Sequence, residues 1–333
     1  MQQTFQALVV SETADQRFIR EIRQRTLAEL PAGDVLIRVH YSSLNYKDAL
    51  SASGNRGVTR RYPHTPGIDA AGVVEASNAP ELRPGDRVLC CCYGLGMNTP
   101  GGFGQYIRVP ANWVHPCPEG LSLRESMIFG TGGFTAALSV DAMLNKGVTP
   151  EAGKILVTGA TGGVGSVSVA ILAKCGYQVV AATGKPEEAD FLKELGAAEV
   201  IGRAQVTDTS DRALLKGRWA GVIDTVGGAL LATALKSTRY GGVVTCCGNV
   251  GGPELHTTVY PFILRGVALL GIDAAECPLA VRTRVWQQLA TTWKIAQLER
   301  LTTEIGLPDL DRTIDAMLQG RHSGRTIVNL EKT

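Results

Sequence analysis

The sequence lacks the features that mark several classes of protein. Its 33 Lys and Arg nearly balance 31 Asp and Glu, for a net charge of +2, and no dense basic tract offers a surface for nucleic acid. Its apolar runs fall well short of the roughly 18 residues of a membrane span, and residues 1–10 lack a secretory signal. We therefore expect a soluble cytoplasmic protein with no nucleic-acid or membrane partner.

Cysteine is present, but its spacing is typical of neither disulfides nor zinc sites. The eight cysteines are Cys90, Cys91, Cys92, Cys117, Cys175, Cys246, Cys247 and Cys277. Adjacent cysteines cannot simply be paired into a disulfide framework, and the five histidines are scattered singly. We expect reduced thiols and no metal.

The 333 residues exceed a typical domain of about 100–200 residues, and their pattern changes along the chain. Up to about Leu121, short strands and turns indicate a β-rich, barrel-like unit. From about Glu151, strand, glycine turn and helix-length segment repeat, which is typical of parallel βαβ units. This α/β region has predicted strands at Lys154–Thr158, Gln178–Ala182, Gly221–Val226 and Gly242–Cys247, and predicted helices at Ser166–Lys174 and Glu187–Leu195. The last part of the chain, with helix-like Val281–Trp293 and strand-like Arg325–Leu330, is expected to return to the first domain.

The sharpest motif is the stretch Ile155–Gly165, an apolar strand that enters a glycine-rich turn and opens a helix. Such a turn lets backbone N–H groups approach a pyrophosphate, and the amino end of the helix adds about half a positive charge. We predict dinucleotide contacts from four turn residues: Thr161, Gly162, Gly163 and Val164. The alternative is an ordinary tight turn.

The next strand ends in Thr183, Gly184 and Lys185, and no carboxylate appears before Glu187. An NAD site usually has an acid here for the ribose 2′-hydroxyl. A cation and a hydroxyl would instead attract a 2′-phosphate, with Arg203 on the other side, so the pattern favours NADPH. The alternatives are a solvated lysine and a helix-end arginine.

Several blocks along the chain resemble the acryloyl-CoA reductase family, in the zinc-free quinone-oxidoreductase-like branch of the medium-chain dehydrogenase/reductase superfamily. The blocks are Ser42–Leu50 (SSLNYKDAL), Pro66–Gly72, Gly159–Gly165, Ile223–Gly227, Tyr240–Gly242, Pro261–Arg265 and Gly324–Thr326. The zinc ligands of related enzymes are missing, because this chain has Gly67-Ile68-Asp69 where they have Gly-His-Glu.

The resemblance implies an α/β protein with a GroES-like β-barrel catalytic domain (residues 1–124 and 266–333) and a doubly wound Rossmann NADPH-binding domain (residues 125–265). It implies NADPH-dependent reduction of the C=C bond of acryloyl-CoA to propionyl-CoA, with hydride added to the β-carbon. Two alternatives remain open: an NADPH-dependent quinone or small-enone oxidoreductase, and a non-catalytic NADPH-binding sensor.

The family's motif places Tyr46 beside the nicotinamide, where its hydroxyl could donate a hydrogen bond or proton. Asn45 and Asp48 are candidate catalytic neighbours, although such residues often only bond nearby backbone. Three further residues are matched to the cofactor more loosely: Asn249, Ile263 and Ala274. Arg325 either binds a phosphate of coenzyme A or braces the strand that returns to the first domain.

The apolar segment Val267–Ile272 is predicted to form a strand at the exposed edge of the parallel sheet. An open apolar edge is an aggregation liability unless it is covered. Pairing across a two-fold axis would cover it, so we expect a homodimer.

A preference for NADPH over NADH is the first testable consequence. The 2′-phosphate has cations to bind at the end of the second strand, whereas the 2′-hydroxyl of NADH has no carboxylate there. Substrate reduction should therefore be faster with NADPH in steady-state assays. Equal rates with both cofactors would contradict this interpretation.

Overall fold

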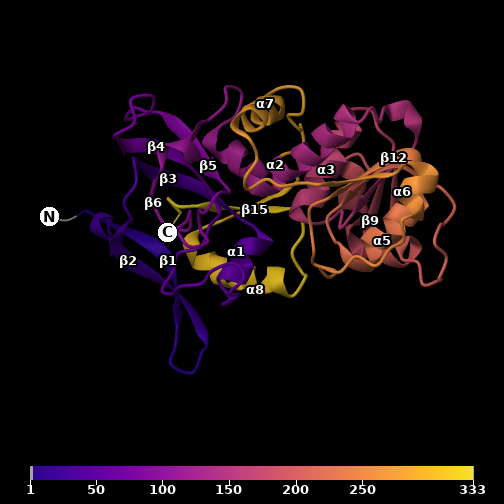
Figure 1. Cartoon of the computed structure of the whole chain (residues 1–333). Helices are drawn as coiled ribbons and strands as arrows, with labels where there is room; N and C mark the ends of the chain where they lie inside the picture. The colour runs from indigo at the N-terminus through magenta and orange to yellow at the C-terminus, as the bar shows by residue number, and fades with distance from the viewer. Residues whose placement is uncertain (1–2, 333) are drawn as a thin grey trace. The chain divides into compact units, whose positions relative to one another are not determined.

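A computed structural model describes residues 3–332 of the chain. The chain divides into two compact units, each described by itself here. Unit 1 comprises Met1–Thr131 and Leu301–Thr333, and unit 2 comprises Gly132–Arg300. Both ends of the chain therefore belong to the same unit, coloured indigo to magenta and yellow in Figure 1.

Unit 1 is built on antiparallel strands. Its seven-stranded sheet has the order β14-β15-β3-β4-β5-β7, with β6 paired to β3, and β1 and β2 form a separate two-stranded sheet. The strands are β1 (Thr4–Glu12), β2 (Phe18–Thr26), β3 (Val35–Leu44), β4 (Asp69–Ser77), β5 (Arg87–Cys91), β6 (Tyr106–Val109), β7 (His115–Pro116), β14 (Thr302–Ile305) and β15 (Arg325–Asn329). Two helices lie within this unit, α1 (Tyr46–Ser51) and α8 (Leu310–Leu318).

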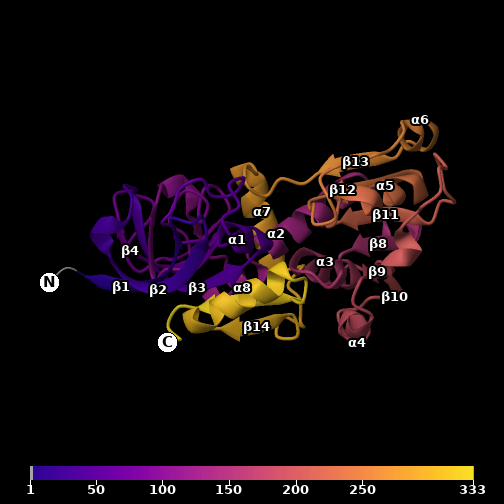
Figure 2. The ribbon, with the colours of Figure 1, turned by 90° about the horizontal axis from the view of Figure 1, so that it is seen from below.

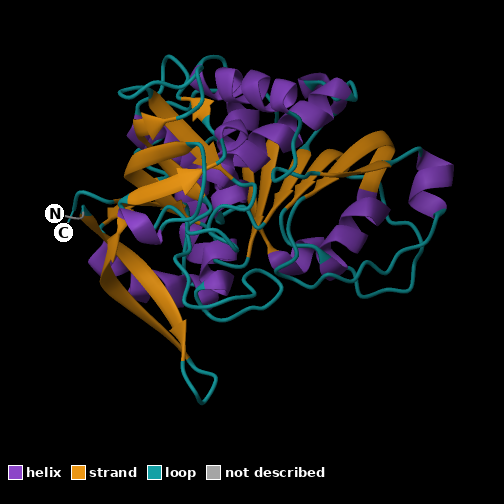
Figure 3. Ribbon diagram, turned by 60° about the vertical axis from the view of Figure 1, so that its left-hand side comes forward, coloured by secondary structure: helices purple, strands orange, loops and turns teal. Residues whose placement is uncertain are grey.

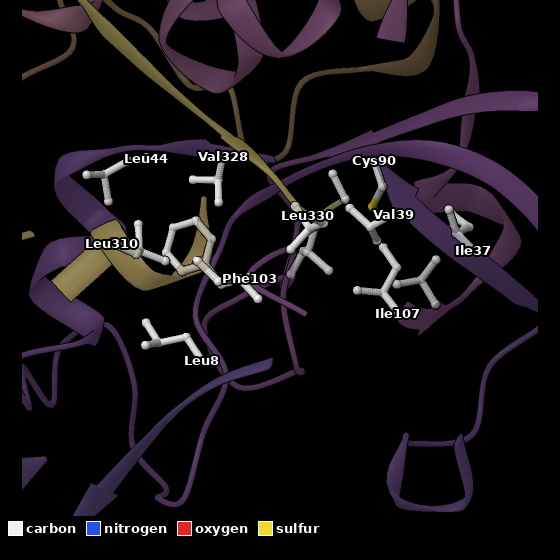
Figure 4. Packing of buried hydrophobic residues seen from close by; sticks show 14 of the residues in the cluster. Leu8, Ile37, Val39, Leu44, Cys90, Phe103, Ile107, Leu310, Val328 and Leu330 are labelled. Carbon is white, nitrogen blue, oxygen red and sulfur yellow. The ribbon is translucent and has the colours of Figure 1, made fainter. Parts of the chain in front are cut away.

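The core of unit 1 draws side chains from strands that are far apart in the sequence. Ile37 and Val39 alternate along β3, and Val328 comes from the returning strand β15. Figure 4 shows these side chains gathered with Phe103 and Leu310. Burying one such aliphatic side chain stabilises the fold by about 1.5–3 kcal/mol. The C-terminal strand is therefore held by the same core as the N-terminal strands.

Unit 2 is a doubly wound parallel sheet with the strand order β10-β9-β8-β11-β12-β13, in which every neighbouring pair is parallel. Its strands are β8 (Ile155–Thr158), β9 (Val179–Thr183), β10 (Glu199–Gly202), β11 (Trp219–Asp224), β12 (Thr238–Cys246) and β13 (Ala268–Gly271). Its helices are α3 (Gly163–Lys174), α4 (Ala189–Glu194), α5 (Gly228–Ser237), α6 (Tyr260–Arg265) and α7 (Leu279–Ala290). Helices cover both faces of the sheet (Figure 3), which explains why its central strands are buried along their whole length.

Helix α2 (Leu123–Asn145) is a feature that the sequence analysis did not predict. It is broken at Gly130, which has φ 48° and ψ −155°. Among the described residues it is the one helix long and apolar enough to cross a membrane, with a mean hydropathy of 1.3, but 83% of that window is buried. Its composition is therefore explained by its place in the protein core.

The domain boundaries differ from the prediction. The units meet at residues 131/132 and 300/301 rather than at 124/125 and 265/266. β13 extends the parallel sheet beside β12 (Figure 2), and Trp286 of α7 stacks on Phe134 of α2 with ring centroids 5.8 Å apart. These contacts hold residues 266–300 in unit 2, and the return to unit 1 begins only at Leu301.

Candidate active site

The glycine-rich turn places the amino end of α3 against the end of β8. Gly159 has φ 60°, and a Cβ at Gly165 would lie 2.3 Å from the Gly159 carbonyl oxygen. Only glycine therefore allows helix and strand to approach this closely. A Cβ at Gly162, the N-cap residue, would meet only the Gly159 oxygen, at 3.2 Å. The turn is thus open on the side where a pyrophosphate would approach the first backbone N–H groups of α3.

The predicted phosphate-binding residues of β9 and β10 come together in the structure. The Thr183 hydroxyl lies 3.3 Å from that of Thr161 and accepts a bond from the Lys185 backbone N–H at 3.0 Å. A Cβ on Gly184 would lie 3.0 Å from an Arg203 Nη atom, so the guanidinium lies directly against this glycine. Partial burial lowers the pKa of Lys185. Thr161, Thr183 and Arg203, from three separate segments, thus lie close to the Gly184–Lys185 turn.

A buried carboxylate that the sequence analysis did not assign ties β11 to β8. Asp224 accepts bonds from the Thr158 hydroxyl at 2.7 Å and from the Gly227 N–H at 2.7 Å. The Thr225 hydroxyl donates back to the Thr158 carbonyl at 2.8 Å. Burial raises the pKa of Asp224. These bonds join the ends of β8 and β11, where the strand order reverses. Doubly wound folds bind dinucleotides at such a point.

Two of the three more loosely matched cofactor residues lie at this same edge of the sheet. Asn249 follows β12, and its Cα would lie 3.2 Å from a Cβ on Gly227. Ala274 follows β13, and its carbonyl accepts a bond from buried Arg282 at 2.8 Å. Both residues come after the carboxyl ends of parallel strands, where backbone contacts to a cofactor are expected.

Ile263 lies apart from these two residues in the sheet, and its role as a cofactor contact stays a prediction. It lies in the short helix α6 and is 67% exposed. Two residues later, Arg265 donates to the carbonyls of Lys236 and Thr238, at the beginning of β12. The helix is therefore attached at the amino ends of the strands, opposite the glycine turn.

In unit 1, the segment Asn45–Asp48 turns the end of β3 into α1. The Asp48 carboxylate accepts the Asn45 backbone N–H at 2.8 Å. Its other oxygen accepts the backbone N–H groups of Gly67 and Ile68 at 3.1 and 2.8 Å. Asp48 is fully buried and positions the helix on the loop before β4. These bonds give Asp48 a positioning role in the fold, and its role as a catalytic residue stays a prediction.

Asn45 belongs to a buried polar cluster around Asp69, a residue to which the sequence analysis assigned no role. The Asp69 carboxylate accepts bonds from the Ser43 hydroxyl at 2.5 Å and from the Asn45 amide at 2.8 Å. It also accepts the backbone N–H and hydroxyl of Thr131, which follows the break in α2. The sequence signal was the glycine-rich stretch 130–133 inside an apolar helix, because a break there frees an N–H for a carboxylate. Asn45 therefore joins this cluster to the amino end of α1, and its catalytic role stays a prediction.

Arg325 completes this cluster and is 2% exposed. Its guanidinium donates to Asn45 Oδ1 at 3.1 Å, to Ser43 Oγ at 3.0 Å and to the Ile128 carbonyl at 2.9 Å. Buried and bonded in this way, Arg325 cannot present its charge to a phosphate of coenzyme A. Of the two roles considered, the structure supports bracing of the return strand β15, and the substrate-binding role is corrected.

Tyr46 is the exception among the motif's candidate catalytic residues. It is the first residue of α1 and is 40% exposed, whereas Asn45 and Asp48 on either side are buried. The buried neighbours hold the helix while the phenol remains accessible. Among the three candidate catalytic residues, Tyr46 is thus the one whose side chain is exposed.

The donor set of the described residues does not fit a metal. No group of three or more His, Cys, Asp or Glu residues within 3–332 could hold an ion. Cys90 and Cys91 are buried in β5, and Asp69 is already bonded to four donor groups of the protein.

Comparison with known proteins gives the same two-part division. Residues 31–119 match the alcohol dehydrogenase GroES-like domain, and residues 163–291 match the zinc-binding dehydrogenase family. The acrylyl-CoA reductase AcuI of Ruegeria pomeroyi is 44% identical over 98% of this chain and 99% of its own. The chain belongs to the acryloyl-CoA reductase family of the medium-chain dehydrogenases/reductases.

Two further proteins place this acryloyl-CoA reductase family member among solved structures. The putative quinone oxidoreductase YhfP of Bacillus subtilis is 46% identical over 99% of this chain and 100% of its own, and its structure with NAD bound has a TM-score of 0.95. The YhdH oxidoreductase of Salmonella enterica in complex with NADP is 43% identical, covers 98% of this chain and 99% of its own, and has a TM-score of 0.95. The predicted family and the predicted fold class are confirmed.

The buried Asp48 carboxyl gives a prediction for stability. Burial, followed by the nearby Asp69 charge, raises the pKa of Asp48 to about 7, against the N–H donors that favour the ionised form. Because the pKa is about 3.9 in an unfolded chain, the contribution of Asp48 to the unfolding free energy is greatest below pH 4 and declines as the pH rises to 7. Asp48→Asn must turn an NH₂ toward backbone donors and should lower the unfolding free energy by about 1–3 kcal/mol in urea at pH 5.

The pH dependence of the stability difference, together with a variant at an exposed aspartate, supplies the control. The stability difference between the wild type and the Asp48→Asn variant should shrink between pH 4 and 7. The same substitution at Asp190, whose side chain is 94% exposed, should change little. A difference for Asp48 that grows over this range would show that its carboxyl is ionised in the folded protein well below pH 7.

Proposed function

We propose that this protein reduces the C=C bond of acryloyl-CoA to give propionyl-CoA, with NADPH as the reductant. The observation that carries the proposal is near full-length identity with two relatives: 44% with the acrylyl-CoA reductase AcuI of Ruegeria pomeroyi, and 43% with the "probable acrylyl-CoA reductase AcuI" of Escherichia coli. The cation and hydroxyl cluster at the ends of β9 and β10 supports the cofactor assignment. The proposed reaction does not depend on Arg325, which is buried and is no longer assigned to a phosphate of the substrate.

The cofactor residues fit a phosphorylated dinucleotide. The amino end of α3 would hold the pyrophosphate, and Thr183, Lys185 and Arg203 would hold the 2′-phosphate. One relative was crystallised with NADP and another, of similar identity, with NAD. Fold alone therefore does not choose between the two, and the proposal of NADPH rests on these three side chains.

The reduction needs a hydride, which the bound nicotinamide supplies to the β-carbon, and a proton at the α-carbon. As the new C–H bond forms, the pair of electrons from the C=C bond moves onto the thioester oxygen as an enolate. A donor aimed at this developing charge stabilises the transition state, by about 3 kcal/mol for one good donor. Tyr46 is the accessible hydroxyl beside the motif, and we assign it this hydrogen bond. Asn45 and Asp48 fix the helix that carries it.

A quinone or small enone is the second candidate substrate. YhfP, a putative quinone oxidoreductase, is 46% identical to this chain, so identity alone does not favour the thioester. Both substrates contain a carbonyl conjugated to a C=C bond, and the same hydride geometry serves both. Any preference for a CoA thioester over a quinone must therefore come from how the enzyme binds the rest of the substrate.

A substrate panel tests the proposal. Steady-state kcat/KM with acryloyl-CoA should exceed the values for crotonyl-CoA and for a simple quinone, because an added β-methyl group crowds the site of hydride addition and a quinone lacks the coenzyme. Tyr46→Phe should lower kcat for acryloyl-CoA at least about tenfold, as expected when one donor to the enolate oxygen is removed. Higher kcat/KM with the quinone would establish the second candidate, and an unchanged kcat in Tyr46→Phe would remove the hydroxyl from the mechanism.

We also propose a homodimer and a reducing, cytoplasmic compartment. β13 occupies the predicted edge of the sheet and pairs only with β12 among the described strands. Val259, Ile263 and Leu264, in the segment that precedes β13, are more than half exposed, at 61%, 67% and 57%. Pairing β13 with its copy would cover this apolar edge. All eight cysteines are described and none forms a disulfide, which is compatible with the cytoplasm.

Sedimentation equilibrium should give twice the 35.3 kDa chain mass. The double substitution Ile263→Glu/Leu264→Glu should shift the protein toward the monomer, because a charge buried at an interface is costly. Leu318→Glu, at an exposed position of α8 in unit 1, serves as the control and should leave the mass unchanged. A wild-type monomer at all concentrations would overturn the dimer.

A further inference from the structure

The loop that follows α1 carries an unusual concentration of positive charge for a chain whose net charge is only +2. Between residues 46 and 61, the exposed charged side chains are Lys47, Arg56, Arg60 and Arg61. The single acid in this stretch, Asp48, is buried and faces inward to backbone N–H groups. The outer surface of the segment therefore has only cations of its own.

This loop is held in place by many hydrogen bonds. The Ser51 and Thr59 hydroxyls lie 2.7 Å apart, and the Tyr62 hydroxyl donates to the Ser51 carbonyl at 2.6 Å. The Thr59 hydroxyl also bonds the Met97 carbonyl at 2.7 Å, and the Arg60 N–H donates to Asn98 Oδ1 at 3.1 Å. The backbone that carries Arg60 and Arg61 is therefore anchored to α1 and to the 97–98 loop, which reduces the entropy lost when a ligand binds.

One of the four cations, Arg56, has partners within the protein. Arg56 pairs with Glu12 at 2.5 Å, donates to the Arg60 carbonyl at 2.9 Å and lies over the rings of Phe18 and Tyr62. Lys47, Arg60 and Arg61 have no carboxylate or aromatic partner among residues 3–332. We call these three residues the basic cluster. Their charges are not neutralised by the protein.

The basic cluster lies close to Tyr46 along the chain: Lys47 is on the same helix, and Arg60 and Arg61 are on the loop that follows it. Lys47 is the next residue, and the 52–62 loop is bonded to Ser51, the last residue of α1. A six-residue helix is only about 9 Å long. A substrate whose reacting group meets Tyr46 and whose anionic end extends along unit 1 would therefore reach these cations.

We propose that the basic cluster binds the phosphate groups of coenzyme A and so selects CoA thioesters over small enones. This inference rests on the proposed function, and it supplies the anion contact that buried Arg325 does not. Coenzyme A carries a diphosphate and a 3′-phosphate at the end remote from the thioester. Arginine forks match phosphate oxygens in pairs, and a lysine adds a point charge.

The test compares substrates with and without phosphates. The double variant Arg60→Ala/Arg61→Ala should raise KM for acryloyl-CoA about tenfold, as expected for the loss of two surface ion pairs of up to about 0.7 kcal/mol each. It should leave kcat within about twofold and leave kcat/KM unchanged for S-acryloyl-pantetheine, which has the thioester and no phosphate. Arg60→Lys/Arg61→Lys should restore most of the affinity, because the charge is kept.

Arg83→Ala is the matched control. Arg83 is an exposed arginine of the same unit, in the turn between β4 and β5. Asp69 at the start of β4 pairs with Cys91 at the end of β5, so this turn lies at the opposite end of the strand pair from Asp69. The Arg83→Ala substitution should change neither the KM for acryloyl-CoA nor the KM for S-acryloyl-pantetheine. Thermal unfolding of each variant identifies any that is misfolded, and the Lys variants then carry the comparison.

Calorimetry with coenzyme A alone separates this inference from the proposed function. The wild type should bind coenzyme A more tightly than pantetheine, and the Arg60→Ala/Arg61→Ala variant should lose that difference. 3′-Dephospho-CoA shows which phosphate is bound. A wild type that reduces only quinones refutes the proposed function, whereas turnover of acryloyl-CoA with equal KM in the double variant and in Arg83→Ala refutes the basic cluster. A rise in KM for NADPH alone would assign these cations to the cofactor and likewise overturn the inference.

Discussion

The structure of unit 1 depends on a buried network in which Arg325 and Asp69 are connected through Ser43 and Asn45. Burying charges away from water is costly, and it is tolerated here because hydrogen bonds satisfy both groups. Burial lowers the pKa of Arg325, and the Asp69 and Asp48 carboxylates oppose that shift. The network joins the C-terminal strand β15 to β3 and β4. It also holds the first residue after the break in α2.

The break in α2 is a direct consequence of this network. A Cβ at Gly130 would lie 2.4 Å from Ser43 Oγ and 2.6 Å from Asp69 Oδ2. The backbone there has φ 48°, a conformation that glycine adopts without strain. The helix is interrupted so that the N–H of Thr131 can point at Asp69. A residue with any side chain at position 130 would have to displace the cluster or the helix.

In both units, buried hydrogen-bonded residues hold the backbone in place next to the residues proposed to bind ligands. In unit 1, buried Asn45 and Asp48 position α1, while Tyr46 and the basic cluster face outward. In unit 2, the Asp224 bonds to Thr158 and Gly227 join the ends of β8 and β11, while a Cβ at Gly162 in the glycine turn would meet only the Gly159 oxygen. Preorganised groups of this kind lose little freedom when a ligand binds, which favours both affinity and catalysis.

The sequence by itself determined the features that depend on local pattern. The strand–turn–helix at Ile155–Gly165 required glycine because backbone must approach backbone, and strands with a parallel-sheet pattern followed it in the expected order. The absence of an acid after β9 and the edge position of β13 were also readable from local pattern.

Only the tertiary structure decided which polar residues are buried and which groups they bond to. Arg325, Asn45 and Asp48 have the residue types of a reactive or anion-binding site, yet each is bonded to a partner far along the chain, 20, 24 or 280 positions away, in a buried site. The place of Ile263 was likewise decided by the tertiary structure, because Arg265 attaches helix α6 where β12 begins. Burial and partnership are long-range properties, since the chain must fold before distant donors and acceptors meet, and no local pattern contains them.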